Sequence, residues 1–344
     1  MPPVLPRPAS APPFESWLQP RPEGIFCAPG EFWIDPARAV PRAVITHAHS
    51  DHARGGHGAV LATPETLEFM RIRLGDGLAA QPARYGEAIA MGDVCVTLRP
   101  AGHVLGSAQV VIEHGGQRAV ISGDYKTVRD PTCEGFEPVV CDLFVTEATF
   151  ALPVFRHPDP AAEIAKLLAS QRLFPASTHV VGCYALGKCQ RLVMLLREAG
   201  YDAPIFLHGA LESMCAAYRA FGVPLGDLRP ATVAAKDALK GAIVLAPPSA
   251  IQDRWARRLH EPVNALASGW MRVRQRAKSR GVELPLVISD HADWDELLAT
   301  LDAVRAPEIW VTHGREEALI HAASLRGIVG RALSLVGREE DAAE

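Results

Sequence analysis

The sequence predicts an α/β protein of two domains, and three observations support that prediction. Short apolar runs rich in β-branched residues alternate with segments of helical periodicity, as in α/β folds and unlike all-β folds. The 344 residues are enough for two domains with sizeable cores. Several apolar runs also end in His or Asp, at the position where α/β sheets usually carry their sites.

The first part of the chain, residues 25–150, reads mostly as short strands separated by Gly and Asp turns. Strands are predicted at 43–46, 94–98, 119–121 and 143–145, because these runs are short, apolar and β-branched. They would form one half of a sandwich that carries most of the candidate ligands.

The middle of the chain predicts a separate domain. A helix is expected over 159–174, with Asp159 as its N-cap and Pro160 in its first position. It is followed by a strand at 178–181, the Gly187-Lys188 turn, a helical run at 192–196, a strand at 204–207, a helix near 211–221 and a strand at 243–246. We therefore place an inserted domain at residues 153–283.

The last part of the chain is predicted to return to the first domain. A strand at 286–288, another at 309–312 and a helix at 316–326 are expected there. The first domain then consists of residues 1–152 and 284–344.

Four potential metal ligands crowd into six residues directly after the predicted strand at 43–46. They are His47, His49, Asp51 and His52, and three imidazoles with one carboxylate suit Zn²⁺ or Mn²⁺. The alternative is a polar loop that is rich in histidine by chance. We disfavour it, because no fold needs such crowding unless something neutralises and orders these groups.

Three later residues supply what a second ion would need. His103 lies in a Gly-flanked turn after 94–98, Asp124 follows 119–121, and His313 ends 309–312. Each taken alone is equally well explained as a loop residue. Together with the first cluster they predict a two-metal site.

This order of ligands resembles the metallo-β-lactamase superfamily. The stretches 146–150, 288–293 and 311–314 resemble motifs A, B and C of its β-CASP nucleases, and 182–190 is similar to a strand-to-helix turn of their inserted domain. The chain looks most like the bacterial DNA-ligase-associated exonucleases, which are related to the cleavage-factor nucleases. The resemblance implies a metallo-β-lactamase αββα sandwich with an inserted β-CASP α/β domain that clamps the substrate.

The resemblance also implies a role for each residue at the site. His47, His49 and His103 would hold one divalent ion, Asp51, His52 and His313 a second, and Asp124 would bridge the two ions, zinc and/or manganese. His291 would protonate the leaving oxygen, and Glu147 would bind its other nitrogen and keep it protonated. The alternative is that His291 and Glu147 only support the ligands. Asp35 would orient a ligand histidine without touching metal.

Residues 254–280, here called the basic segment, carry eight Arg and Lys residues against one acid, whereas the whole chain has a net charge of −4. Such an asymmetry predicts nucleic-acid binding, for which we name Arg272, Arg274 and Arg276. Trp255 and Trp270 lie among the arginines and would stack on bases. The alternative is a solvated helix face with core tryptophans. Lys188, at a helix start, would also contact phosphate or would simply be a surface lysine.

Three classes of function stay open. The first is a DNA exonuclease of repair that acts 5′→3′ on single-stranded ends, with a functional link to an ATP-dependent DNA ligase and a helicase. The second is an RNA-processing nuclease, because in the β-CASP group a motif C histidine such as His313 occurs mainly in RNA-cutting members. The third is a non-hydrolytic scaffold. A β-lactamase or thioesterase is disfavoured, since neither needs the inserted domain or the basic segment.

Composition predicts a cytoplasmic enzyme. The seven cysteines contain no Cys-x-x-Cys pair and predict reduced thiols. The N-terminus lacks a charged-then-apolar signal pattern and is proline-rich as far as Pro22, which predicts an arm around the core. No run approaches the length of about 18 apolar residues that a membrane span requires.

Overall fold

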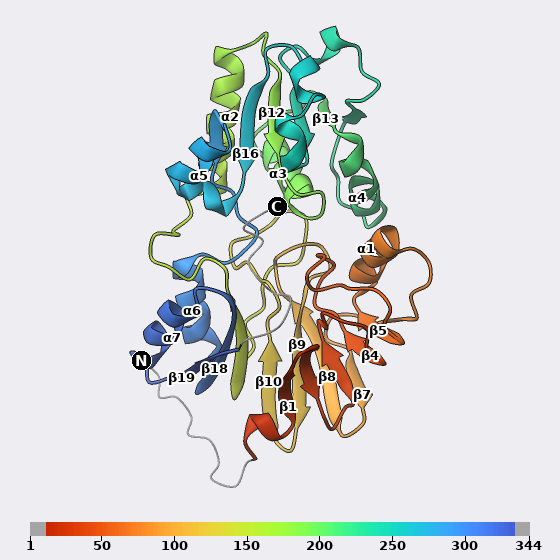
Figure 1. The fold of residues 1–344 in the computed structure, drawn as a ribbon, viewed down its shortest axis with the longest axis vertical. Helices are drawn as coiled ribbons and strands as arrows, with labels where there is room; N and C mark the ends of the chain where they lie inside the picture. Colours follow the sequence, from red (N-terminus) through yellow and green to blue (C-terminus); the bar gives the residue numbers. More distant parts are fainter. Residues whose placement is uncertain (1–11, 334–344) are drawn as a thin grey trace. The chain divides into compact units, whose positions relative to one another are not determined.

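The computed structural model describes residues 12–333, and the chain divides into two compact units (Figure 1). Unit 1 combines the residues up to Val154 with those from His291 onward, and unit 2 comprises Phe155–Asp290. The first junction lies at 154/155, against 152/153 in the prediction. The second lies at 290/291, against the predicted 283/284.

Unit 1 contains two β-sheets. The first has the order β1-β2-β3-β4-β5-β6, with β1 Leu18–Arg21, β2 Gly24–Cys27, β3 Phe32–Ile34, β4 Arg42–Val44, β5 Ala59–Ala62 and β6 Ala80–Pro82. The second has the order β19-β18-β11-β10-β9-β8-β7, with β7 Ala88–Met91, β8 Val94–Pro100, β9 Ala108–His114, β10 Gln117–Ile121, β11 Leu143–Ala148, β18 Glu308–Gly314 and β19 Val329–Ala332. Its helices are the 3-10 turn η1 Phe14–Ser16 and α1 Pro64–Leu74, α6 Trp294–Val304 and α7 Glu316–Ser324.

The two sheets share one apolar core. Ile34 and Val44 from the first sheet belong to the same buried cluster as Val96, Ile112 and Val145 from the second. A second cluster joins the outer face of β11 and β18 to α6 and α7, which lie beside β18 and β19 in Figure 1. Helix α1 follows β5 and contacts β6 at the other side of the sandwich. Helices thus flank two stacked sheets, as the αββα prediction requires.

Unit 2 is a parallel α/β domain. Its sheet has the order β14-β13-β15-β12-β16-β17, and every pair of neighbouring strands is parallel. The strands are β12 His179–Gly182, β13 Ile205–Leu207, β14 Leu228–Pro230, β15 Ile243–Ala246, β16 Val263–Ala267 and β17 Leu284–Leu286. The helices are α2 Pro160–Leu173, α3 Lys188–Glu198, α4 Gly209–Ala220 and α5 Arg274–Ser279, with the 3-10 turns η2 Lys236–Leu239, η3 Pro248–Gln252, η4 Ala256–Arg258 and η5 Gly269–Arg272.

The predicted strand at 286–288 needs correction. The strand there is β17, which spans Leu284–Leu286 and pairs with β16 of unit 2, so it does not return to the first domain. Residues beyond Leu286 are still held by unit 2, since the Val287 amide donates to Glu163 of α2. The chain re-enters unit 1 only at His291.

The proline-rich N-terminal arm is described from Pro12 onward, and residues 1–11 of that prediction lie outside the described residues. Phe14 and Trp17 belong to the core of unit 1, and β1 pairs with β2 in antiparallel register. Within residues 12–333, none of the helices combines the length and the apolar character that a membrane crossing would need.

Candidate two-metal centre

Three neighbouring parallel strands deliver three of the site residues to one edge of a sheet. β11 pairs in parallel with β10 on one side and with β18 on the other. Their carboxyl ends therefore lie together, and they carry Asp124 just after β10, Glu147 near the end of β11 and His313 near the end of β18. Placing polar groups at this edge leaves the apolar run of each strand buried.

The loop after β4 is ordered by Asp35. One carboxylate oxygen of Asp35 accepts from the Thr46 amide at 2.7 Å, and the other accepts from the Thr46 hydroxyl at 2.6 Å. The second oxygen also lies 2.7 Å from Nδ1 of His52. The Thr46 hydroxyl lies 3.1 Å from Nδ1 of His47. Both histidines therefore have their Nδ1 atoms engaged, so each presents Nε2 to the centre of the site, as metal-binding histidines do.

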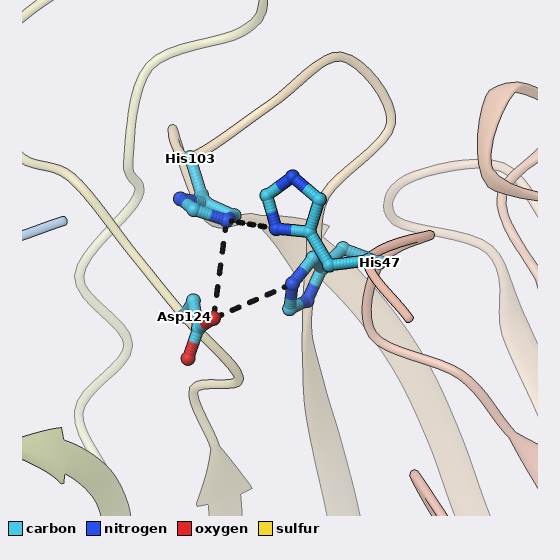
Figure 2. Close-up of side chains that lie close together, drawn as sticks. His47, His103 and Asp124 are labelled. Atoms are coloured by element: carbon cyan, nitrogen blue, oxygen red, sulfur yellow. Dashed lines mark hydrogen bonds and ion pairs between the residues drawn. The ribbon is translucent and has the colours of Figure 1, made fainter. Parts of the chain in front are cut away.

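The ligand atoms form two adjoining groups. One group contains His47, His49, His103 and Asp124, and the other contains Asp51, His52 and His313; within each, the ligand atoms lie within 4.8 Å of one another. Figure 2 shows His47 and His103 directed toward Asp124. Oδ2 of Asp124 lies 3.4 Å from His47 Nε2, 3.3 Å from His52 Nε2 and 3.9 Å from His103 Nε2. Asp124 thus reaches into both groups.

These separations fit residues that share an ion. Ligands bonded to one ion at about 2.0–2.1 Å in tetrahedral geometry lie about 3.4 Å apart. His52 Nε2 lies 3.3 Å from Asp51 Oδ2 as well as from Asp124 Oδ2. The Nε2 atoms of His47 and His52 are buried and have no hydrogen-bond partner among the described residues, which is costly unless something else binds them. The donor set therefore fits two divalent cations.

The electrostatics of the site favour bound cations. Burial, and next the neighbouring His52, lower the pKa of His47 to about 4. Burial would lower the pKa of His52 too, but Asp124, Asp51 and Asp35 outweigh it and raise that pKa well above its usual value. Burial would raise the pKa of Asp124, yet His52 and His291 hold it well below its ordinary range. A neutral His47 and an ionised Asp124 are the forms that bind metal, and the carboxylates around His52 stabilise positive charge.

A β-bulge brings His313 to the site. Glu147 pairs with Thr312 and Ala148 with Gly314, so His313 is the extra residue, and its φ is 62°. A bulge residue in the left-handed region re-aims its side chain. The ring of His313 stacks on that of His52 with centroids 5.3 Å apart. Gly314, at φ 82°, passes so close to the Ala148 carbonyl that a Cβ would collide with it. This explains why a glycine follows His313.

His291 and Glu147 form a pair beside the ligands. Nδ1 of His291 lies 3.0 and 3.2 Å from the two Glu147 oxygens and 4.0 Å from Asp124 Oδ2. Glu147 is buried and also accepts from the Tyr125 amide at 2.9 Å. The His291 side chain is 22% exposed to solvent. Glu147 therefore fixes the tautomer that carries a proton on Nδ1.

Two supporting contacts were missed from the sequence. Arg73 of α1 donates to the Ala48 carbonyl at 2.5 Å, between the first two ligand histidines. Glu296 accepts from Lys126 and from the Thr127 and Val128 amides, which follow Asp124. The Asp293-x-x-Glu296 spacing is a capping-box signal for α6 that the sequence does carry. Nothing in the sequence signals the contact of Arg73.

Lys188 is not at the surface. The side chain is 2% exposed, and its ammonium donates to Asp290 Oδ1 at 2.5 Å and to the Ile288 carbonyl at 3.2 Å. The predicted phosphate contact needs an accessible ammonium, so we exclude Lys188 from the candidate nucleic-acid interface. Its position at the start of α3 was correct, but its partner lies about one hundred residues away in sequence and could not be inferred.

The basic segment is mostly solvent-exposed. Arg272 and Arg274 are exposed, and Arg276 is half-buried with its guanidinium 3.9 Å from the centroid of the Trp270 ring. Phe155 packs against Trp270 in an edge-to-face contact with centroids 5.1 Å apart. Trp255 is likewise half-buried and packs edge-on against His208. The tryptophans are thus packed within unit 2, whereas six of the eight basic side chains face solvent, at Arg254, Arg257, Arg258, Arg272, Arg274 and Lys278.

Comparison with known proteins shows which proteins the chain is similar to. No known family model matches the chain. A protein of Opitutus terrae described as a probable DNA ligase is 28% identical over 296 residues, which cover 85% of this chain and 28% of that protein. Ribonuclease TTHA0252 of Thermus thermophilus is 25% identical over 384 residues, which cover 88% of each chain.

The chain is a relative of the β-CASP nucleases of the metallo-β-lactamase superfamily.

A solved structure is similar to this β-CASP relative in fold. The crystal structure of a protein of unknown function from Enterococcus faecalis superposes with a TM-score of 0.54 at 16% identity, and covers 78% of this chain and 74% of its own. The predicted metallo-β-lactamase sandwich with an inserted β-CASP domain is confirmed. The β-CASP relative spans little more than a quarter of the Opitutus protein, whereas it spans most of the Thermus ribonuclease.

Proposed function

We propose that this protein is a metal-dependent phosphodiesterase that acts on nucleic acid, and specifically an exonuclease that degrades single-stranded DNA ends in the 5′→3′ direction during repair. The observation that carries the proposal is the clustering of seven candidate ligand side chains, Asp124 among them, next to the His291–Glu147 pair. This combination would supply both cation binding and a proton donor, which two-metal phosphodiester hydrolysis uses.

Two divalent ions, Zn²⁺ or Mn²⁺, would be held by the ligands as grouped above, with Asp124 shared between them. When bound, such ions activate water for attack on phosphorus and neutralise charge on the phosphate oxygens. The side chains around them have separate tasks. Asp35 and Thr46 fix the rings of His52 and His47, so the ligands are oriented before any ion binds.

His291 is the proposed general acid. Its Nδ1 is bonded to Glu147, so Nε2 is the atom that would donate a proton to the leaving sugar oxygen. The buried carboxylate of Glu147 would stabilise the imidazolium before transfer and hold the ring in one orientation. A ring fixed in this way retains the alignment that efficient proton transfer needs.

The preference for DNA is supported by the Opitutus protein, in which a segment similar to this chain lies within a longer polypeptide described as a probable DNA ligase. A covalent connection of that kind also supports a functional link between this chain and a separate DNA ligase. The further link to a helicase of the same repair pathway is part of the proposal only through the family resemblance. The basic segment would contact the phosphate backbone through Arg272, Arg274 and Arg276.

RNA cleavage is the second candidate function. It is favoured by the similarity to the Thermus ribonuclease along 88% of both chains, and by the histidine at position 313. The two functions require the same metal centre and differ only in how the sugar is accommodated.

The test is cleavage of matched single-stranded DNA and RNA, labelled at the 5′ or the 3′ end, with Mn²⁺ or Zn²⁺ and with Asp124→Ala as the control. Release of a labelled mononucleotide from 5′-labelled DNA, with little release from RNA, is the expected result. Preferential cutting of RNA would replace the DNA proposal with the ribonuclease one. Hydrolysis of a lactam or thioester without any cleavage of either polymer would overturn both.

A further inference from the structure

The segment that leads into His291 is held by helix α3 and its neighbour α2. We infer that Lys188, with Arg191, is a positioning residue for His291: the two side chains bind the residues directly before it and so restrict the backbone from which the proton donor projects. This inference rests on the proposed role of His291 as general acid.

Lys188 makes the central contact. Its ammonium binds both the Asp290 carboxylate, at 2.5 Å, and the Ile288 carbonyl, at 3.2 Å. The side chains of Lys188 and Asp290 are 2% and 7% exposed, so water does not compete for this ion pair. Asp290 is joined to His291 by one peptide bond. A buried charge-assisted bond one residue away therefore restricts the backbone from which the histidine projects.

The neighbouring residues are held in the same way. Arg191, one turn along α3 and fully buried, donates to the Ser289 carbonyl at 2.7 Å. Glu163 of α2 accepts from the Val287 amide at 2.7 Å. Side chains of unit 2 thus bind every residue from Val287 to Asp290, and these four residues belong to no helix or strand. The contacts replace the hydrogen bonds that a regular element would supply.

The start of α3 is itself well fixed. Gly187 takes φ 85° at the N-cap, its amide donates to the Gln190 side chain at 2.9 Å, and that side chain donates back to the Ala185 carbonyl at 2.9 Å. On the other side of His291, the Ala292 amide donates to the Tyr125 carbonyl at 2.7 Å. The Tyr125 amide in turn binds Glu147, the partner of His291. His291 therefore projects from a backbone that is anchored on both sides.

The experiment is a double-mutant cycle between Lys188→Met and His291→Ala in the full-length protein, assayed for nucleic-acid cleavage at saturating metal. Lys188→Met removes the ammonium and keeps the apolar stem. Misplacement of a reacting group by about 1 Å costs on the order of 100-fold in rate. We expect kcat to fall 10- to 100-fold with KM and bound metal nearly unchanged, and Lys188→Arg to restore part of the rate. In the His291→Ala background, Lys188→Met should lower kcat less than twofold, because the imidazole that Lys188 positions is already absent.

Arg197→Met is the matched control. Arg197 lies in the last turn of the same helix and donates to the Tyr201, Ala203 and Asp227 carbonyls, so its loss perturbs α3 without touching residues 287–290. Its kcat should stay within twofold of the unsubstituted protein. Equal losses from Lys188→Met in the two backgrounds, or an equal loss from Arg197→Met, would overturn the inference. Should Lys188→Met not fold, the isosteric Asp290→Asn enters the same cycle.

Hydrogen exchange separates the failure of this inference from the failure of the proposed function. The peptide covering residues 287–292 should exchange at least tenfold faster in Lys188→Met than in Arg197→Met, whether or not the protein cleaves nucleic acid. If the unsubstituted protein cleaves neither DNA nor RNA, the proposed function fails while faster exchange still supports the anchoring. Unchanged exchange in Lys188→Met overturns the inference by itself.

Discussion

Asp124 is the side chain on which both ligand groups converge, because its Oδ2 lies within 4 Å of three ligand histidines. Asp124→Ala should therefore reduce bound metal by at least one ion per chain and abolish cleavage. Metal content by atomic absorption and cleavage of labelled DNA and RNA measure the two effects. Asp237→Ala, which removes an exposed carboxylate that pairs with Lys240 in unit 2, is the control. Normal activity of Asp124→Ala would contradict the two-metal interpretation.

His291 should separate metal binding from turnover. In His291→Ala the metal content should stay at the level of the unsubstituted protein, since the proposed ligands are all intact, while kcat falls by about 100-fold or more, within the range of general acid catalysis. The control is His321→Ala, an exposed histidine of α7. Retained turnover would remove His291 as the proton donor and leave it a supporting role.

Among the elements, the bulge in β18 has a direct test. Gly314→Ala adds a Cβ that collides with the Ala148 carbonyl at a residue with φ 82°. We expect a loss of about 2 kcal/mol or more in the free energy of unfolding, together with reduced metal binding through the displaced His313.

Gly327→Ala provides the comparison for the bulge. Gly327 has a similar φ of 75°, but among residues 12–333 no heavy atom beyond its chain neighbours lies within 4 Å of the added Cβ. The decrease in the free energy of unfolding of Gly327→Ala, measured with urea, should reflect backbone strain alone and amount to about 1 kcal/mol. Equal losses for the two variants would mean that the collision is relieved at no cost.

Helix α6 should make the fold sensitive to acid. Burial would raise the pKa of Glu296, but Lys126 and the surrounding donors lower it from 4.5 to about 2. The unfolded chain therefore binds a proton near pH 4.5, before the folded chain does. The stability contributed by Glu296, of the order of 3 kcal/mol, is complete above about pH 4.5 and is lost as the pH falls toward 2.

Urea unfolding of the metal-free protein between pH 3 and pH 6 measures this effect. Glu296→Gln should be less stable than the unsubstituted protein at pH 6 and should show a shallower decline toward pH 3. Parallel pH dependences of the two proteins would contradict the assignment to Glu296.

The positions of strands could be predicted from the local sequence, whereas the pairing of a strand with residues distant in the sequence could not. The apolar β-branched runs that became β8, β10, β15 and β18 were placed within a few residues, because such runs are buried strands in most contexts. The strand near residue 286 was also found, but its sheet was assigned wrongly. A three-residue strand carries no local record of which neighbour it pairs with, and here the partner is β16.

The candidate site shows the same division. The candidate ligands could be named because metal chemistry restricts residue types, and the structure brings them together because strand ends gather them. The buried pairing of Lys188 with Asp290, and the contact of Arg73 with the Ala48 carbonyl, depend on how distant segments pack. A lysine at a helix start is usually exposed, so the sequence favoured the wrong environment.

For the whole molecule, the distribution of charge is uneven: the net charge is negative, whereas the basic segment is strongly positive. The chain has a net charge of −4, yet six exposed basic side chains lie in residues 254–280. Replacement of Arg272, Arg274 and Arg276 by alanine should weaken nucleic-acid binding and reduce the slope of log K against log salt by up to about 0.7–0.9 for each phosphate that these side chains neutralise. Fluorescence anisotropy at several salt concentrations measures the slope.

The control for this triple variant changes net charge equally elsewhere. Arg71, Arg99 and Arg118 each pair with a carboxylate in unit 1, at Glu68, Glu137 and Glu113. Their replacement by alanine should leave the salt slope close to that of the unsubstituted protein. A slope unchanged in the first variant, or reduced equally in both, would mean that the basic segment does not contact the nucleic acid.

The interrupted path of unit 1 has a consequence during translation. Strand β11 lies between β10 and β18 in the sheet, but β18 is synthesised only after all of unit 2. A nascent chain that has reached residue 290 already contains six of the seven ligands, yet it lacks both His291 and His313 and exposes β11 as an unpaired edge. We therefore expect the proposed site to be completed only when the last strands are made, and we expect a chain that stops early to lack activity and to be prone to aggregation.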